Sequence, residues 1–244
     1  MIHGITLYVM LVIFLATLIR STIGFGEALV SVPLLALRLP VTVAAPLAVV
    51  VSILIAGLIV AQDWRDVEVR SAGWLVASSL AGIPIGLLLL TLASDHVVKA
   101  ILGVIIAAFA AYSLLANGRR HLERDHLMLL LGTGFLSGIL GGAYGMNGPP
   151  LAVYGSLRRW GPQQFRATLQ GYFLVASLAG LAGYATVGLL HPPLGRYLLV
   201  SLPGVVVGVV VGRVLNRRLR GDAFFRVVHG GLVVIGCVLV AQST

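Results

Sequence analysis

Two charged side chains, Arg20 and Glu27, lie in otherwise apolar sequence, within the stretch RSTIGFGEALVSVP at residues 20–33. A charge at membrane depth costs about 3 kcal/mol or more unless a partner or water compensates it. The guanidinium of Arg20 offers paired donors that suit an oxyanion such as sulfite, a sulfonate or a carboxylate. Arg20 could instead reach a membrane interface, or form a permanent salt bridge with Glu27. Alternatively, Glu27 could take up and release a proton during a cycle, and the sequence leaves these roles open.

The glycine pattern of this stretch returns in SGILGGAYGMNGPP at residues 137–150, where aligning Pro33 with Pro150 places Gly24 on Gly141. A glycine-rich break frees backbone N–H and C=O groups, which hydrocarbon tolerates only where protein or a watery cavity surrounds them. Two such breaks, in corresponding places of two halves, are typical of a transporter binding site. The glycines could alternatively serve helix packing alone. The candidate substrate-binding residues are Arg20, Ser21, Gly24, Gly26, Glu27, Gly141, Gly142, Tyr144, Gly145 and Asn147, with Pro33, Pro149 and Pro150 as predicted helix breaks.

The composition indicates a polytopic membrane protein. The 244 residues are 59% hydrophobic and 10% charged, with a mean hydropathy of +1.03. At about 20 apolar residues per helix, this length allows about eight spans. The net charge of +9 is scattered between apolar runs, so it indicates membrane topology and no nucleic-acid partner. Cys237 is alone, which excludes an internal disulfide and a multi-cysteine metal site, and no other pattern predicts a metal or cofactor.

We predict an all-α fold of two inverted repeats, residues 1–117 and 127–244, joined by a cytoplasmic linker at 118–126. Each repeat is a glycine-broken helical hairpin followed by three transmembrane helices, giving 8–10 helices in total. The small-xxx-small pairs Gly82/Gly86 and Gly204/Gly208 support the repeat and predict close helix packing. This topology gathers most of the arginines on one side, which the positive-inside rule makes cytoplasmic, with both termini periplasmic.

Three polar residues, Arg166, Thr168 and Gln170, open the span after the second break and could face the site. We interpret Arg166 as an interfacial topology charge.

The paired segments IGFGEALVSVPLLAL and LGGAYGMNGPPLAVYG resemble those of the TauE/SafE family, also called the toluene sulfonate uptake permease family. The resemblance covers essentially the whole chain. Glu27 and the run from Asn147 to Pro150 depart from the common motifs. Membership implies a permease of the bacterial inner membrane for sulfite, organosulfonates or related sulfur-containing anions.

The leading hypothesis is therefore a secondary transporter that holds a small sulfur-containing anion between the two breaks. A passive anion channel is the alternative, since the same polar gap would serve it. An enzyme is not expected, because no nucleophile stands beside a base within the spans. Membrane lipid and a small anion are the expected partners, and a homodimer is compatible with the sequence.

Overall fold

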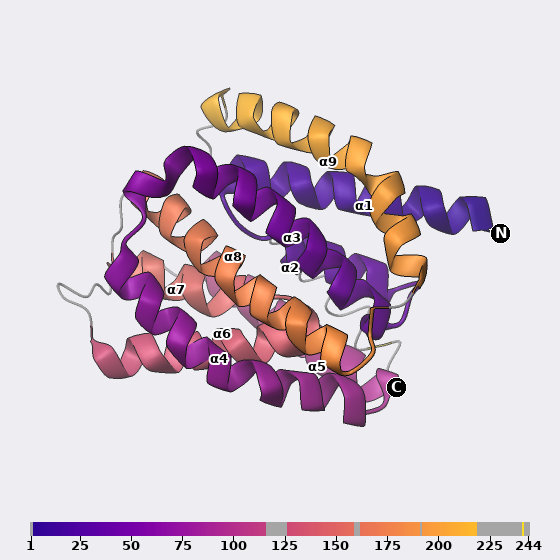
Figure 1. The fold of residues 1–244 in the computed structure, drawn as a ribbon, viewed down its shortest axis with the longest axis horizontal. Coiled ribbons are helices and arrows are strands. Elements are labelled where there is room, and N and C mark those ends of the chain that lie inside the picture. Colours follow the sequence, from indigo (N-terminus) through magenta and orange to yellow (C-terminus); the bar gives the residue numbers. More distant parts are fainter. Residues whose placement is uncertain (1, 116–125, 159–161, 191, 219–240, 242–244) are drawn as a thin grey trace.

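A computed structural model describes residues 2–115, 126–158, 162–190, 192–218 and 241 (Figure 1). The described part of the chain is helical, without strands, which confirms the all-α prediction. Six of its helices are long and apolar enough to cross a membrane: α1, α3, α4, α5, α6 and α9. The elements are α1 (Ile2–Ile23), α2 (Glu27–Ala36), α3 (Val41–Asp63), the short 3-10 turn η1 (Trp64–Asp66), α4 (Val69–Leu92), α5 (Asp95–Leu115), α6 (Leu127–Tyr144), α7 (Gly148–Arg158), α8 (Pro162–Thr186) and α9 (Pro192–Arg218).

The two halves share an order of helix lengths. In the first half, α1 of 22 residues precedes α2 of 10, and α3 and α4 follow with 23 and 24. In the second, α6 of 18 residues precedes α7 of 11, and α8 and α9 follow with 25 and 27. The last predicted span and nearly all of the linker at 118–126 lie outside the described residues. The inverted relation of the halves stays a prediction.

The chain breaks later than the sequence suggested, at residues 24–26 and 145–147. Arg20 therefore lies in the last turn of α1, and Gly141 and Gly142 lie inside α6, so the prediction that these two glycines interrupt the helix was wrong. Gly24, Gly26 and Gly145 have φ of 99°, 96° and 65°, a left-handed conformation that only glycine adopts readily. The positions that turn the chain are these three glycines.

The prolines do not break the helices as predicted. Pro33 lies inside α2, which continues to Ala36. Pro149 and Pro150 lie in the first turn of α7, where a missing N–H costs no helical hydrogen bond. Because the prolines occupy different helical positions in the two halves, aligning Pro33 with Pro150 gave the wrong register. The structure matches Gly24 with Gly145 instead.

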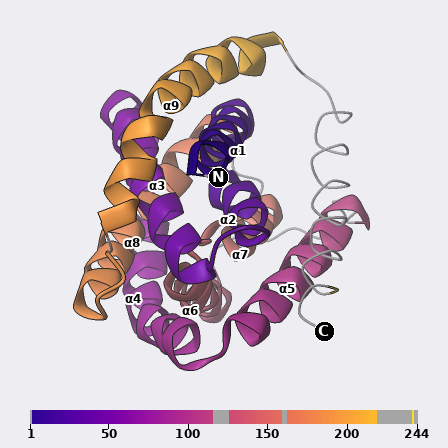
Figure 2. The same ribbon diagram turned by 90° about the vertical axis from the view of Figure 1, so that its right-hand side faces the viewer.

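Close packing joins helices from different halves. In Figure 2, α1 lies beside α9 and α4 beside α6, while α2 and α7 are enclosed by the longer helices. A Cβ atom on Gly82 would lie 2.2 Å from the carbonyl oxygen of Phe135 in α6. A Cβ on Gly208 would lie 3.1 Å from the side chain of Thr17 in α1. These contacts confirm the predicted packing role of both small-xxx-small pairs.

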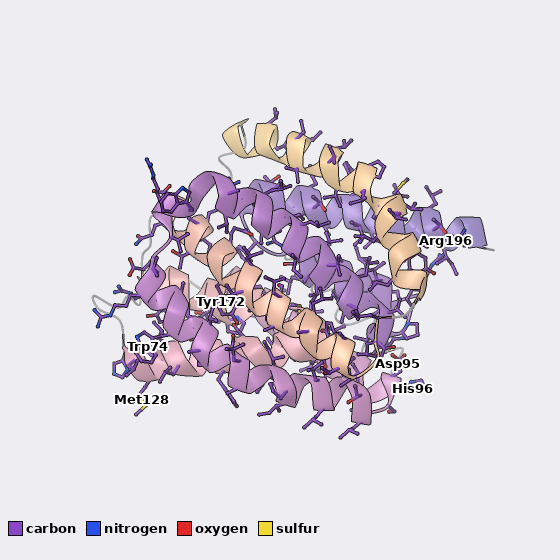
Figure 3. All side chains as sticks on the ribbon, in the orientation of Figure 1. Trp74, Asp95, His96, Met128, Tyr172 and Arg196 are labelled. Atoms are coloured by element: carbon purple, nitrogen blue, oxygen red, sulfur yellow. The ribbon has the colours of Figure 1, made fainter. Side chains whose placement is uncertain are left out.

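The outer face of the bundle is apolar, with exposed side chains such as Leu88 on α4 and Val210 on α9. Trp74 and Met128 lie at one end of the bundle, and Asp95 and Arg196 lie toward the other (Figure 3). An apolar outer face of this kind is what a multi-pass membrane protein presents to lipid.

Candidate functional site

Arg20 is the charged centre of the site, and only 2% of its surface is exposed. The last turn of α1 brings its guanidinium against the start of α2 and the middle of α3. Nη1 donates to Glu27 Oε2 at 3.1 Å and to Ser52 Oγ at 2.8 Å. Glu27 is 1% exposed, and its Oε1 accepts a hydrogen bond from Ser31 Oγ at 3.4 Å. The predicted pair of Arg20 and Glu27 therefore exists as a buried salt bridge.

Gln170 of α8 ties this charge to the first break. Its Oε1 accepts a hydrogen bond from Arg20 Nη2 at 2.5 Å, and its Nε2 donates to the Gly24 carbonyl at 2.6 Å. The amide thus satisfies a carbonyl that the end of α1 leaves free. The sequence suggested only that Gln170 could face the site. The sequence feature that indicates a buried partner for Gln170 is its place within an apolar span, where an unpaired amide would be costly.

An aromatic ring covers the other side of Arg20. The guanidinium carbon lies 5.3 Å from the ring centroid of Phe173, one helical turn beyond Gln170. This distance is within the range of a cation–π interaction, which is strengthened away from water. Neither Ser52 nor Phe173 was among the predicted site residues, because their roles depend on how α3 and α8 pack around α1.

A small pocket of about 20 Å³, roughly the size of one water molecule, lies between the two breaks and is partly open to the outside. The N-terminal residues of α2 line one side, and the second break with the start of α7 lines the other. No side chain caps the N-terminus of α2 at Gly26. The first N–H groups of α2, which lie beside the pocket, therefore have no side-chain acceptor. The lining residues are Arg20, Phe25, Gly26, Glu27, Ala28, Leu29, Ser52, Gly145, Met146, Asn147, Gly148, Pro149 and Phe173.

Asn147 is the polar side chain that the second break contributes. Its backbone carbonyl accepts a hydrogen bond from Ser137 Oγ at 2.9 Å, which fixes the turn. Its Oδ1 is buried without a hydrogen-bond partner, and it packs on Gly141 so closely that a Cβ there would lie 1.8 Å away. Gly141 thus acts by leaving room for Asn147, and it does not line the pocket itself.

Besides Gly24 and Gly141, three further predicted binding residues do not line this pocket. Ser21 faces α9, where a Cβ on Gly212 would lie 2.5 Å from its Cβ. Tyr144 points to α5, and its hydroxyl donates to the Val98 carbonyl at 3.1 Å. Gly142 packs against α4, where a Cβ would meet the Ile83 carbonyl oxygen at 2.2 Å. In this conformation all three hold helices together.

The arrangement combines one cation, one carboxylate and several hydrogen-bond donors around a small space. Arg20 still has an Nε–H group without an acceptor, although it is buried. Because Glu27 balances the charge of Arg20, an anion entering the pocket must compete with that carboxylate for the guanidinium. Within the described residues, no group of three or more His, Cys, Asp or Glu side chains could hold a metal ion.

A comparison with protein families matches the chain over residues 9–239 to the family model described as Sulfite exporter TauE/SafE. This is nearly the whole chain, and it confirms the resemblance inferred from the glycine-rich segments. The family is one of transporters, which fits the expectation that the chain is not an enzyme. No curated protein and no solved structure gave a significant match.

Proposed function

Because the chain belongs to the TauE/SafE sulfite exporter family, we propose that it is a secondary transporter of a small sulfur-containing anion. Sulfite, a sulfonate or a sulfo-carboxylate would be carried across the bacterial inner membrane by alternating access, with both termini periplasmic. The observation that carries the proposal is the buried guanidinium of Arg20 in the lining of a pocket between two helix breaks. A buried cation at such a place is a functional feature by default, because its desolvation is costly.

The groups around the pocket suit an oxyanion. Arg20 supplies a charged fork, of which the Nε–H has no acceptor in the structure. The uncapped N-terminus of α2 adds main-chain N–H groups and the positive end of a helix dipole. Asn147 reaches the pocket from the opposite break and offers a neutral donor through its amide nitrogen. If the two breaks move apart to admit a tetrahedral or pyramidal oxyanion, it would take hydrogen bonds from both sides of this space.

Glu27 supplies a means of coupling transport to protons. Its carboxylate occupies Arg20 Nη1 at 3.1 Å, so anion binding and ionised Glu27 oppose each other. When Glu27 takes up a proton, Arg20 is released to the anion, and one proton would move with each anion bound. Replacing Glu27 with Gln should preserve anion exchange and abolish the dependence of transport on a proton gradient. Gradient-driven uptake by this variant at the wild-type rate would exclude Glu27 as the coupling group.

The decisive experiment measures sulfite binding to purified protein in detergent. Arg20→Gln should weaken binding at least about tenfold, since it removes a charge-assisted interaction worth about 1.5–3 kcal/mol. Arg38→Gln is a matched control, because Arg38 is exposed, lies over the ring of Tyr8 at 4.9 Å and is not in the pocket lining. Unchanged affinity in Arg20→Gln would refute the assignment. Counterflow in liposomes would then distinguish a carrier from a passive anion channel.

A further inference from the structure

Arg166 lies one helical turn before Gln170 on α8, so both side chains leave the same face of the helix. Its aliphatic stem packs on the first break: a Cβ atom on Gly24 would lie 3.4 Å from Arg166 Cγ. Gln170 donates to the carbonyl of that same glycine and accepts from Arg20. Arg166 is therefore joined to the pocket through the residues that hold Arg20 in place.

A second connection runs through two aromatic rings. The residue beside Arg166, Phe165, packs against Phe25 edge to face, with 6.1 Å between the ring centroids and 81° between the ring planes. Phe25 lines the pocket and stands between two glycines of positive φ, Gly24 and Gly26. Arg166 thus lies next to a part of the pocket wall whose backbone glycine makes adaptable.

The guanidinium of Arg166 has unused binding capacity. Its Nε is buried and has no hydrogen-bond partner, although the side chain as a whole is only half-buried. Within the described residues, the two salt bridges are those of Arg20 with Glu27 and of Lys99 with Asp95, so neither neutralises Arg166. A topology charge at the interface would explain a basic residue at this end of α8. It would not explain why the stem of Arg166 packs on the helix break and its Nε is buried.

We propose that Arg166 forms an outer binding position for the transported oxyanion, one step before the pocket at Arg20. This inference rests on the proposed function and adds a second site to it. The anion would be attracted and held by the Arg166 fork, and would then pass beside Phe25 to reach Arg20. The outer position raises the local anion concentration at the pocket. It therefore increases the transport rate at low anion concentration more than the saturated rate.

The test compares sulfite uptake into liposomes at limiting and at saturating sulfite. Arg166→Gln should lower the rate at limiting sulfite about fivefold, the factor expected when a solvated contact between two unit charges about 4 Å apart is lost. The saturated rate should change less than about twofold. Arg166→Lys, which keeps the charge, should retain more than half of the wild-type rate at limiting sulfite. Arg70→Gln removes an exposed arginine at the start of α4 and should leave both rates unchanged.

Several results would overturn the inference: no effect of Arg166→Gln, an equal loss at limiting and saturating sulfite, or the same loss in Arg70→Gln. A measurement on the wild type needs no variant to fold, since added potassium gluconate should lower the rate at limiting sulfite by screening Arg166. A salt-independent rate would contradict the proposal. Arg20→Gln in the same assay separates the two proposals. If it transports like wild type, the proposed function fails, whereas loss in Arg20→Gln with no effect in Arg166→Gln refutes only the outer position.

Discussion

Gln170 offers the sharpest test of the site, because one amide makes two buried hydrogen bonds of opposite sense. Replacing it with Leu removes the acceptor of Arg20 Nη2 and the donor to the Gly24 carbonyl, which lie at 2.5 and 2.6 Å. Gln170 is fully buried, so water cannot easily replace either partner. Replacing it with Glu keeps the acceptor, but its second oxygen can donate to the carbonyl only when the carboxyl is protonated.

The structure sets the size of the effect. An unsatisfied buried carbonyl costs about 1–3 kcal/mol and a lost bond to a charged group about 1.5–3 kcal/mol, so Gln170→Leu should destabilise the protein by roughly 3–5 kcal/mol. For a chain of this size that corresponds to a fall in Tm on the order of 10 °C. Sulfite binding should weaken as well, since Arg20 is no longer held in position.

Thermal unfolding in detergent between about pH 8 and pH 5 separates the variants. Gln170→Glu should regain stability as the pH falls, because the protonated carboxyl can restore the bond to Gly24, whereas Gln170→Leu should not. Leu178→Ala, at an exposed position of the same helix, is the control and should follow the wild type. A Gln170→Leu protein that loses less than about 1 kcal/mol would show that these hydrogen bonds are not made. Parallel pH responses of the Leu and Glu variants would refute the assigned donor.

Three further substitutions test the packing and the pocket. Gly86→Ala would bring a Cβ to 2.1 Å from a backbone carbonyl of α6, so we expect the free energy of unfolding to fall by several kcal/mol. In the control Gly180→Ala nothing lies within 4 Å of the new Cβ, and the free energy of unfolding should change by less than about 0.5 kcal/mol. Gly24→Ala should cost about 1–2 kcal/mol from its φ of 99° alone, and a neutral result would contradict the left-handed turn. Ser52→Ala removes one of the two acceptors of Arg20 Nη1 and should change sulfite affinity severalfold without unfolding the protein. Identical binding isotherms for the variant and the wild type would exclude a role of Ser52 in positioning Arg20.

The sequence was sufficient to predict a helical membrane protein, two glycine-rich breaks and a charged pair at the first of them. Hydropathy, glycine spacing and the cost of a buried charge are local properties, so they can be read without coordinates. The register of the breaks could not be read in this way. Whether Gly141 or Gly145 turns the chain depends on which backbone carbonyls find partners after packing. Pro33 remains inside α2, and a helix surrounded by protein tolerates such a proline.

The partners of Arg20 were hidden for the same reason. Ser52 and Phe173 come from α3 and α8, and nothing in the periodicity of those helices marks the one residue that will face α1. Tyr144 shows the opposite error, because a polar side chain near the break looked functional but donates to a carbonyl of α5. A polar group inside a membrane protein must find some partner, and the nearest carbonyl often provides it.

Each break begins with a left-handed glycine, but the chemistry of the two breaks differs. Gly24 N donates to the Arg20 carbonyl at 2.6 Å, and Gly145 N donates to the Gly141 carbonyl at 2.8 Å, so Arg20 and Gly141 hold equivalent places four residues before each turn. A second arginine at Gly141 would put two like charges beside one small pocket, and it would also displace Asn147, whose Oδ1 fills the space of the missing Cβ. Glycine at this position instead admits a neutral amide opposite the cation. The pocket thus has one charged and one uncharged wall. Under the proposed function, an anion bound by Arg20 would be released without overcoming a second cation.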